Sequence, residues 1–428
     1  MRTLLRNLIL VVLVLLIFHQ SSQEISFYEM VLGFVVLIVV IISVLSLLVS
    51  KKPLPKPLIY LLAFTIWVVL DIFIAWSSGV DLLWSLRRFF PILTFAGLAL
   101  AAFTSFRSNK EILIAYWEMV FISIIVILRL MSGLNYINLG LIDNAQLLRQ
   151  YSGGYFASFS FCLVLPFFFY KMKSKFLKVA IFIAVFLLGF GLVFSLTRTY
   201  WISTTLSVLF MIYLIKRKQR NFAFGVFFRL ATFGVLIIVI IILIANEINV
   251  PIVTYALSRI NSINTDLSFL VRLMELKGIW ESILKNPITI LIGNGLGAKF
   301  TFYSVNPFSW GTLGWMQNDY SHNYYAYLLW STGLIDLVLF LMAFGSFLRQ
   351  SIQCLVCSKE MSSSDVYLIG VLAVVVNLLI TSLAGPPLFE INWSIYFGVL
   401  VGLGLVLMKV SHISNLEELN KEKEQLYE

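Results

Sequence analysis

One histidine of this chain lies among hydroxyl, amide and carboxyl side chains. His322 is one of only three His, and it is flanked by Asp319, Tyr320, Asn323 and Tyr324. An imidazole titrates near neutral pH and can take a proton from a hydroxyl group. Two interpretations are therefore open for His322: a general base, or an interfacial residue that only makes hydrogen bonds. The His, Cys, Asp and Glu residues match no metal-ligand spacing, so we expect no metal site.

The composition indicates what kind of protein must position this histidine. Of the 428 residues, 60% are hydrophobic and 12% are charged, whereas soluble domains carry roughly 25% charged residues. A soluble enzyme, a disordered chain and a disulfide scaffold are therefore excluded. We predict an all-α, polytopic membrane helix bundle with about 12 transmembrane helices of about 20 residues each. The predicted spans are 3–18, 27–50, 57–76, 83–105, 111–130, 154–170, 177–195, 199–215, 222–245, 323–347, 365–383 and 391–409.

The basic residues predict the orientation of these spans. Clusters such as Lys51–Lys52 and Lys216–Lys218 fall on one side of the membrane when twelve spans are counted, and the positive-inside rule makes that side cytoplasmic. Both termini are then inside, and the net charge of +10 is a topology signal. The predicted domains are nine transmembrane helices over 1–245, a large periplasmic loop over 246–321, three transmembrane helices over 322–409, and a cytoplasmic tail over 410–428.

Arginine dominates the basic residues predicted to face outward. Lysine alone would satisfy topology, whereas the planar guanidinium of arginine also grips a phosphate group at two points. Together these residues predict an anionic substrate at the outer face. For any single arginine, pairing with a lipid headgroup is an equally good interpretation. The outward arginines are Arg87, Arg88, Arg129, Arg149, Arg198, Arg259 and Arg272.

The predicted periplasmic loop, 246–321, contains an amphipathic helix pattern and a glycine-rich segment. Asn286–Pro287 ends the helix, and Arg272 lies on the flank of its apolar stripe, near the headgroup plane if the helix rests on the membrane. The glycines of Gly293–Gly297 predict a tight turn or a close backbone approach. The apolar stripe recurs at 4-3-4-3 spacing and consists of Phe269, Leu273, Leu276, Trp280 and Ile283.

Several segments resemble one family of membrane enzymes. SHNYYAYLLWSTGLIDLVLF (321–340) resembles the His-Asn signature of the O-antigen ligase and O-antigen polymerase family of bacterial membrane glycosyltransferases. FSLTRTYWISTTL (194–206) resembles the outer turn of that family, and RLMELKGIWESILKNPITILIGNGLGAKF (272–300) resembles its outer-loop element. LLRQYSGGYFASFSFCLVLPF (147–167) resembles the entry to an earlier span. The likeness runs from about 149 to 345.

This resemblance implies an activity and a site. The family takes a glycan from undecaprenyl diphosphate at the periplasmic face and passes it to an acceptor hydroxyl, as metal-independent inverting transferases of the GT-C class without cofactors. His322 matches the proposed general base, and Arg198 and Arg272 match arginines that bind the donor diphosphate. The implied location is the bacterial inner membrane, with the active site periplasmic. Further candidates for substrate binding are Arg149, Arg259, Arg88, Asn323 and Tyr324.

Two reactions fit the resemblance, and one function of another class stays open. A polymerase adds the growing chain to a second lipid-linked unit, whereas a ligase moves the finished chain to the lipid A core. The expected partners are the undecaprenyl-diphosphate-linked glycan, an acceptor glycan or lipid A core, membrane lipids and other polysaccharide-assembly proteins, with no nucleic acid. The alternative is a polysaccharide transporter or flippase, which would favour charged or broken helices near the midplane. Asp336 within a predicted span departs from the family pattern, and Cys354 and Cys357 form a lone CxxC pair.

Overall fold

The computed structural model describes most of the chain. The described residues are 1–18, 27–50, 53–138, 153–170, 174–195, 197–219, 267–305, 313–357 and 361–427. They form two compact units. The first comprises residues 1–119, 267–357 and 375–428, and the second comprises 120–266 and 358–374. The predicted span 222–245 lies outside the described residues.

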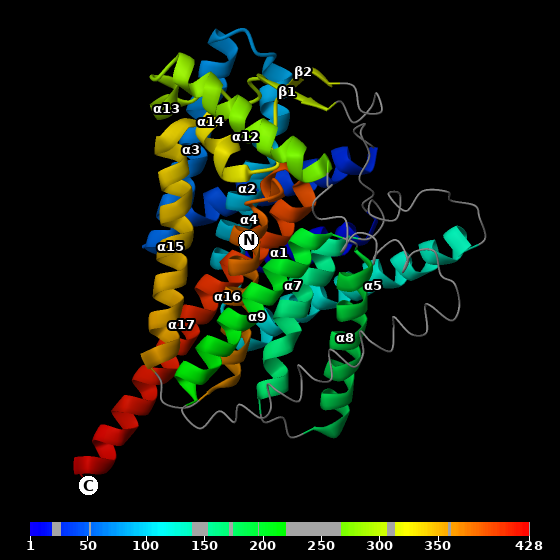
Figure 1. Ribbon diagram of the computed structural model, residues 1–428. Coiled ribbons are helices and arrows are strands. Elements are labelled where there is room, and N and C mark those ends of the chain that lie inside the picture. The colour runs from blue at the N-terminus through cyan, green and yellow to red at the C-terminus, as the bar shows by residue number, and fades with distance from the viewer. Residues whose placement is uncertain are drawn as a thin grey trace. The chain divides into compact units, whose positions relative to one another are not determined.

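The first unit contains the N-terminal helices, the folded part of the loop and the C-terminal helix (Figure 1). Helices α5 and α16 continue from this unit into the second one. Its elements are α1 (Arg2–Leu15), η1 (Leu16–Phe18), α2 (Phe27–Ser50), α3 (Lys56–Ser77), α4 (Leu82–Ser105), α5 (Asn109–Asn138), α12 (Leu267–Lys285), α13 (Thr289–Ile292), β1 (Phe300–Val305), β2 (Leu313–Asn318), α14 (Tyr324–Ser331), α15 (Gly333–Cys357), α16 (Ser363–Thr381), η4 (Pro387–Phe389) and α17 (Ile391–Tyr427).

The second unit adds a smaller group of helices to its shares of α5 and α16. Ser158 Oγ and Thr204 Oγ1 lie 2.6 Å apart, and Ser160 donates a hydrogen bond of 2.7 Å to Ser123. Lys218 and Asp365 form an ion pair of 3.1 Å that is almost fully buried. The elements complete within this unit are α7 (Gly154–Val164), η2 (Leu165–Phe169), α8 (Lys175–Phe194) and α9 (Arg198–Lys218).

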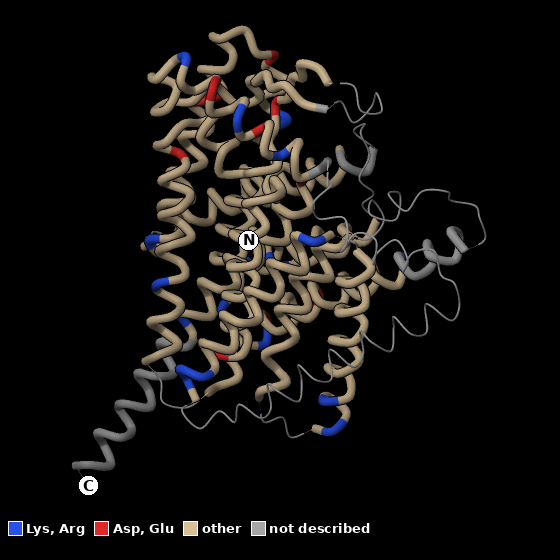
Figure 2. Tube along the Cα trace, in the orientation of Figure 1, with Lys and Arg blue, Asp and Glu red and all other residues tan. Residues whose placement is uncertain are grey.

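The polytopic membrane bundle predicted from composition is confirmed. Nine helices in the described part of the chain are long and apolar enough to cross a membrane. The expectation of about twelve is met only in part. Residues 3–18 form the 14-residue α1 and a short 3₁₀ helix, and Gly154–Phe169 is also shorter than a full span. Charged residues are sparse along the helices and gather around the β1–β2 hairpin and at helix ends (Figure 2).

The predicted span 323–347 was wrong in its bounds, because the helix breaks at Thr332. Gly333 has φ +84°, and a Cβ there would lie 2.3 Å from the carbonyl oxygen of Leu291. The membrane-crossing helix is therefore α15, Gly333–Cys357, and α14 is a separate helix of 8 residues. A β-branched residue followed by a left-handed glycine ends a helix in this way.

The glycine-rich segment closes the broken end of α14. The backbone N–H groups of Asn294 and Gly295 donate to the carbonyls of Trp330 and Ser331, at 3.0 and 2.9 Å. The indole N–H of Trp67 donates to the carbonyl of Thr332 at 3.1 Å. These donors replace the partners that a continuous helix would supply. The close backbone approach predicted for Gly293–Gly297 is thereby confirmed.

The folded part of the loop is a helix packed on a β-hairpin. Strands β1 and β2 pair antiparallel, with Phe302 opposite Met316. Helix α12 approaches β1 so closely that a Cβ at Gly278 would lie 2.5 Å from the Cβ of Phe302. The cluster between them consists of Ile279, Ile283, Phe300, Phe302 and Trp330.

The helix predicted in the loop exists, but the face predicted to carry its apolar stripe is mostly exposed. Phe269 and Trp280 are 60% and 57% exposed, whereas Ile283, the last residue of the predicted stripe, is buried with Ile279 against the hairpin. Both faces of α12 are apolar, so periodicity alone does not tell which one packs on protein. The outward stripe is the face available to the membrane interface.

Replacing Gly333 with alanine is expected to destabilise the protein. The left-handed φ costs about 1–2 kcal/mol for an L-residue, and the clash with Leu291 adds about 1–3 kcal/mol. Gly345→Ala on α15 is the matched control, because a Cβ there meets nothing within 4 Å. Thermal unfolding of the purified protein in detergent measures both. Equal midpoints for the two variants would contradict the role given to Gly333.

Candidate functional site

His322 is held by a buried carboxylate. Its ring Nδ1 lies 2.9 Å from Oε2 and 3.1 Å from Oε1 of Glu275, and its backbone N–H donates to Oε2 at 3.1 Å. Asn318 Nδ2 donates to Oε1 at 3.4 Å. The Glu275 side chain is 1% exposed, whereas that of His322 is 32% exposed. A substrate can therefore reach the imidazole but not the carboxylate behind it.

This contact selects the reactive nitrogen of the ring. An ionised carboxylate only accepts hydrogen bonds, so the tautomer that satisfies this contact has its proton on Nδ1. The lone pair of the neutral imidazole is then on Nε2, the nitrogen that makes no contact with Glu275. A proton taken up at Nε2 gives an imidazolium that the carboxylate stabilises, as the buried Asp does in serine hydrolases. The pair has the geometry of a general base and its orienting group.

Three elements bring these two residues together. Glu275 is on α12, Asn318 ends β2, and His322 precedes Asn323, the N-cap residue of α14. The side chain of Asn323 caps α14 by accepting from the N–H of Ala326 at 3.0 Å. The backbone N–H of Tyr324 donates to the carbonyl of Ser382 at 2.8 Å, which joins this turn to the end of α16. The position of His322 thus depends on segments far apart in the sequence.

A second ion pair lies beside the histidine. The guanidinium of Arg88 bonds to Oδ2 of Asp319 at 2.5 and 2.7 Å, and the indole N–H of Trp84 donates to the same oxygen at 2.9 Å. The guanidinium also lies over the rings of Trp84 and Phe389, at 4.9 and 4.7 Å from their centroids. These contacts therefore hold the side chain of Arg88, which is on α4, against the turn after β2. Its predicted contact with substrate stays a prediction.

Tyr320 connects this ion pair to the histidine. Its ring centroid lies 5.7 Å from that of His322 and 6.2 Å from that of Phe389. Burial raises the pKa of the Tyr320 phenol above its ordinary value, and the nearby charges of Glu275 and Asp319 raise it further. The phenol therefore stays protonated at neutral pH and can act as a hydrogen-bond donor beside the imidazole.

The other predicted site residues are distributed over both units. Arg272 is half-buried on α12, one turn before Glu275, so the loop helix carries both a candidate phosphate ligand and the partner of His322. Arg198 is the first residue of α9, in the second unit. Tyr324 is fully buried, and its ring lies against Tyr327, Phe340 and Phe389. Arg149 and Arg259 lie outside the described residues.

The comparisons with known proteins identify the same segments. Residues 183–341 match the sequence model of the O-antigen ligase family. The similarity to the O-antigen ligase family therefore covers this central part of the chain. This match confirms the resemblance inferred from the motifs, and it covers Arg198, Arg272 and His322. No curated protein matches the sequence. Members of the family are membrane glycosyltransferases in the assembly of surface polysaccharides.

Within the matched residues 183–341, Glu275 is the residue that sequence reasoning missed. A single carboxylate on a loop helix looks like a solvated residue, because charged residues are almost never fully buried unless they are paired. The available signal was its spacing, one helical turn after Arg272 on a helix with two apolar faces. Asp336, which departs from the family pattern, is fully buried at the start of α15. Cys354 and Cys357 form no disulfide bond with each other.

Removing the Asp319 carboxylate is expected to destabilise the protein. Asp319→Ala leaves the half-buried guanidinium of Arg88 without its partner, which costs about 2–4 kcal/mol. Glu281→Ala is the matched control. Its ion pair with Lys277 is long, at 3.8 Å, and exposed, so its loss costs less than about 1 kcal/mol. Unfolding midpoints in detergent compare the two, and an equal loss would show that the Arg88–Asp319 pair is not structural.

Proposed function

We propose that this protein is a metal-independent, inverting glycosyltransferase that moves a glycan from undecaprenyl diphosphate to an acceptor hydroxyl. The observation that carries the proposal is the partly exposed imidazole of His322 held by the buried carboxylate of Glu275, within the residues that match the O-antigen ligase family. The acceptor of such a transfer is a weakly acidic alcohol. A base oriented by a carboxylate is the group that this reaction needs.

The reaction follows from the chemistry of donor and acceptor. Nε2 of His322 takes the proton as the acceptor oxygen bonds to the anomeric carbon from the face opposite the leaving group, which inverts that carbon. The bond between the anomeric carbon and the diphosphate oxygen breaks, and its electron pair stays on the diphosphate. The free energy comes from the activated donor, so no nucleotide is consumed. The imidazolium later releases its proton to water.

The leaving diphosphate needs positive charge, and two arginines are proposed to supply it. Arg272 lies on the same helix as Glu275. Arg198 begins α9, where the N-terminal backbone N–H groups also favour an anion. Guanidinium groups can bond two phosphate oxygens at once, and they stabilise the charge that builds as the glycosidic bond breaks. We propose Arg272 as a ligand of the donor diphosphate on the helix that carries Glu275, and Arg198 as a diphosphate ligand because it matches the family arginine with that role.

The proposed orientation places this site on the periplasmic face of the bacterial inner membrane, with both termini cytoplasmic. The support is the charge distribution under the positive-inside rule. A second lipid-linked glycan and the lipid A core are the two acceptors to be compared. Membrane lipids and other polysaccharide-assembly proteins are the remaining proposed partners.

Transfer in proteoliposomes tests the proposed function. The purified protein is supplied with an undecaprenyl-diphosphate-linked glycan and with either a second lipid-linked unit or lipid A core, and the products are separated by size. His322→Ala, Arg198→Ala and Arg272→Ala are each expected to reduce turnover by at least about 100-fold. Wild-type turnover by His322→Ala would overturn the assignment of the base. Flipping of the donor without transfer would favour the transporter instead.

Glu275→Gln is expected to lower kcat by about 100-fold while KM for the donor changes little. Gln keeps the size of the side chain but loses the charge that stabilises the imidazolium. Glu281→Gln, an exposed position on the same helix, is the matched control and is expected to keep wild-type kcat. The same transfer assay measures both variants, and unfolding midpoints check that both fold. A rise in KM with unchanged kcat would assign Glu275 to binding rather than to the base.

A further inference from the structure

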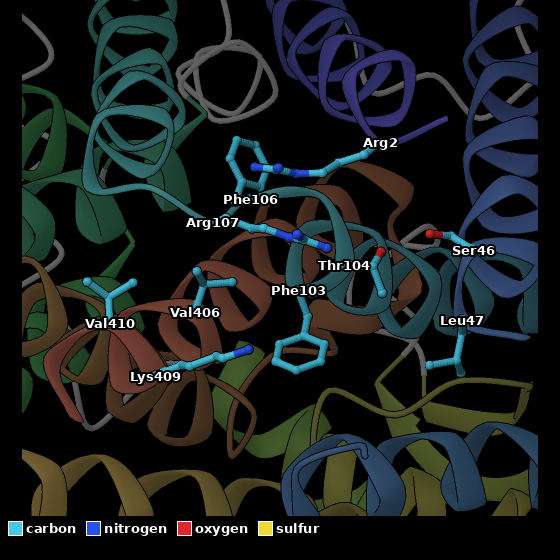
Figure 3. A pocket seen from close by; sticks show the side chains of 10 residues that line it. All are labelled: Arg2, Ser46, Leu47, Phe103, Thr104, Phe106, Arg107, Val406, Lys409 and Val410. Atoms are coloured by element: carbon cyan, nitrogen blue, oxygen red, sulfur yellow. The ribbon is translucent and has the colours of Figure 1, made fainter. Parts of the chain in front are cut away.

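A cavity lies in the first unit among helix ends that do not contribute to the histidine site. Its volume is about 250 Å³, and it is bounded by α1, α2, α4 and α17 together with the turn after α4. The cationic side chains on it are those of Arg2, Arg107 and Lys409. Figure 3 shows the nitrogen ends of Arg107 and Lys409 directed toward the same space, beside Phe103 and Thr104.

The positive charge at this cavity is only partly neutralised. Arg2 and Arg6 share the carboxylate of Glu111 at 2.9 and 2.6 Å, and Arg2 also donates to the carbonyl of Ser105 at 2.7 Å. Glu111 in addition accepts from the backbone N–H of Arg107 at 2.9 Å. The guanidinium of Arg107 and the ammonium of Lys409 form no ion pair with any described residue. An anion in the cavity could therefore pair with Arg107 and Lys409, beside Arg2, which Glu111 and the carbonyl of Ser105 hold in place.

The cavity lies where membrane-crossing segments end. The candidate spans of α2, α4 and α17 finish at Val49, Ser105 and Val410, so the cavity is at the depth of lipid headgroups. Its walls include the apolar side chains of Leu47, Phe103 and Val406. The neighbouring residues Leu48 and Val49 of α2 are exposed hydrophobics, which is the surface that an acyl chain covers. Cations at headgroup depth beside an apolar helix surface match an anionic amphiphile.

The volume limits the size of the ligand. Pockets for drug-sized molecules usually enclose about 300–1,000 Å³, so about 250 Å³ accommodates a phosphodiester headgroup but not a glycan chain. The charge distribution predicts that this face is cytoplasmic, on the side opposite the proposed transfer site. The cavity is thus separate from the donor and acceptor sites.

We propose that this cavity binds the phosphodiester headgroup of an anionic phospholipid, such as phosphatidylglycerol, from the cytoplasmic leaflet. Arg107 and Lys409 pair with the phosphate, and Arg2 forms the third side of the site. The acyl chains lie along the exposed apolar residues of α2. The cavity is lined by Arg2 of α1, Thr104 of α4 and Lys409 of α17. The bound lipid therefore links the N-terminal helix to the C-terminal helix.

Native mass spectrometry of the full-length protein, freed of lipid in detergent, tests this site. Phosphatidylglycerol is titrated against phosphatidylcholine with the same acyl chains, and we expect the anionic lipid to bind at least about tenfold more tightly. The variant Arg107→Gln/Lys409→Gln is expected to weaken phosphatidylglycerol binding by about fivefold for each removed charge. Binding of phosphatidylcholine is expected to stay unchanged.

A control variant and soluble anions test whether the binding is specific to this cavity and to a lipid. Lys175→Gln/Lys178→Gln removes two exposed lysines of α8 and is expected to bind phosphatidylglycerol as the wild type does. Equal binding by the Arg107/Lys409 variant and the wild type overturns the proposal, as does an equal loss in the Lys175/Lys178 variant. Inorganic phosphate and glycerophosphoglycerol are titrated separately. If either competes at the concentration of the lipid, the site takes a soluble anion and the lipid assignment is wrong.

Discussion

The requirement that every backbone carbonyl near the membrane finds a donor governs the arrangement of this protein's first unit. The interruption between α14 and α15 leaves carbonyls of Trp330, Ser331 and Thr332 without helical partners, and in lipid each would cost several kcal/mol. The glycine-rich loop and Trp67 supply the missing donors. Since that loop follows α12 in the chain, closing the broken helix also docks α12. The docked α12 then places Glu275 against His322. The same packing therefore supplies donors to the backbone carbonyls and assembles the candidate site.

The charges at the outer end of this unit perform two different tasks. Arg88 and Asp319 neutralise each other between two aromatic rings, and this pair joins α4 to the turn that leads to His322. Arg272, on the same helix as Glu275, is the arginine proposed to bind the diphosphate. Both tasks use arginine, because the planar guanidinium group binds a carboxylate and a phosphate with the same geometry. The residue type alone therefore does not separate a structural arginine from a substrate-binding one.

Hydropathy predicted the membrane-crossing helices well where the chain crosses without interruption, as in 27–50, which matches α2 residue for residue. It failed where tertiary contacts override local preference. The residues around Thr332 are apolar enough to continue a helix, and only the packing of Gly333 against α13 explains the break. The buried face of α12 was missed because the hairpin that covers it was not predicted. His322 was identified from its type and position, but Glu275 was not, since its burial depends on that same docking.

The double contact between Glu275 and His322 has a stereochemical consequence. One carboxylate accepts from the backbone N–H and contacts the ring of the same residue, so the backbone holds the carboxylate in place, and rotation of the imidazole about its side-chain bonds would lose the ring contact. Only one nitrogen faces outward, and it faces in one direction. In a transferase, a base with a single line of approach admits the attacking alcohol along a single trajectory. A fixed rotamer of His322 would thus set the direction from which the acceptor alcohol is deprotonated.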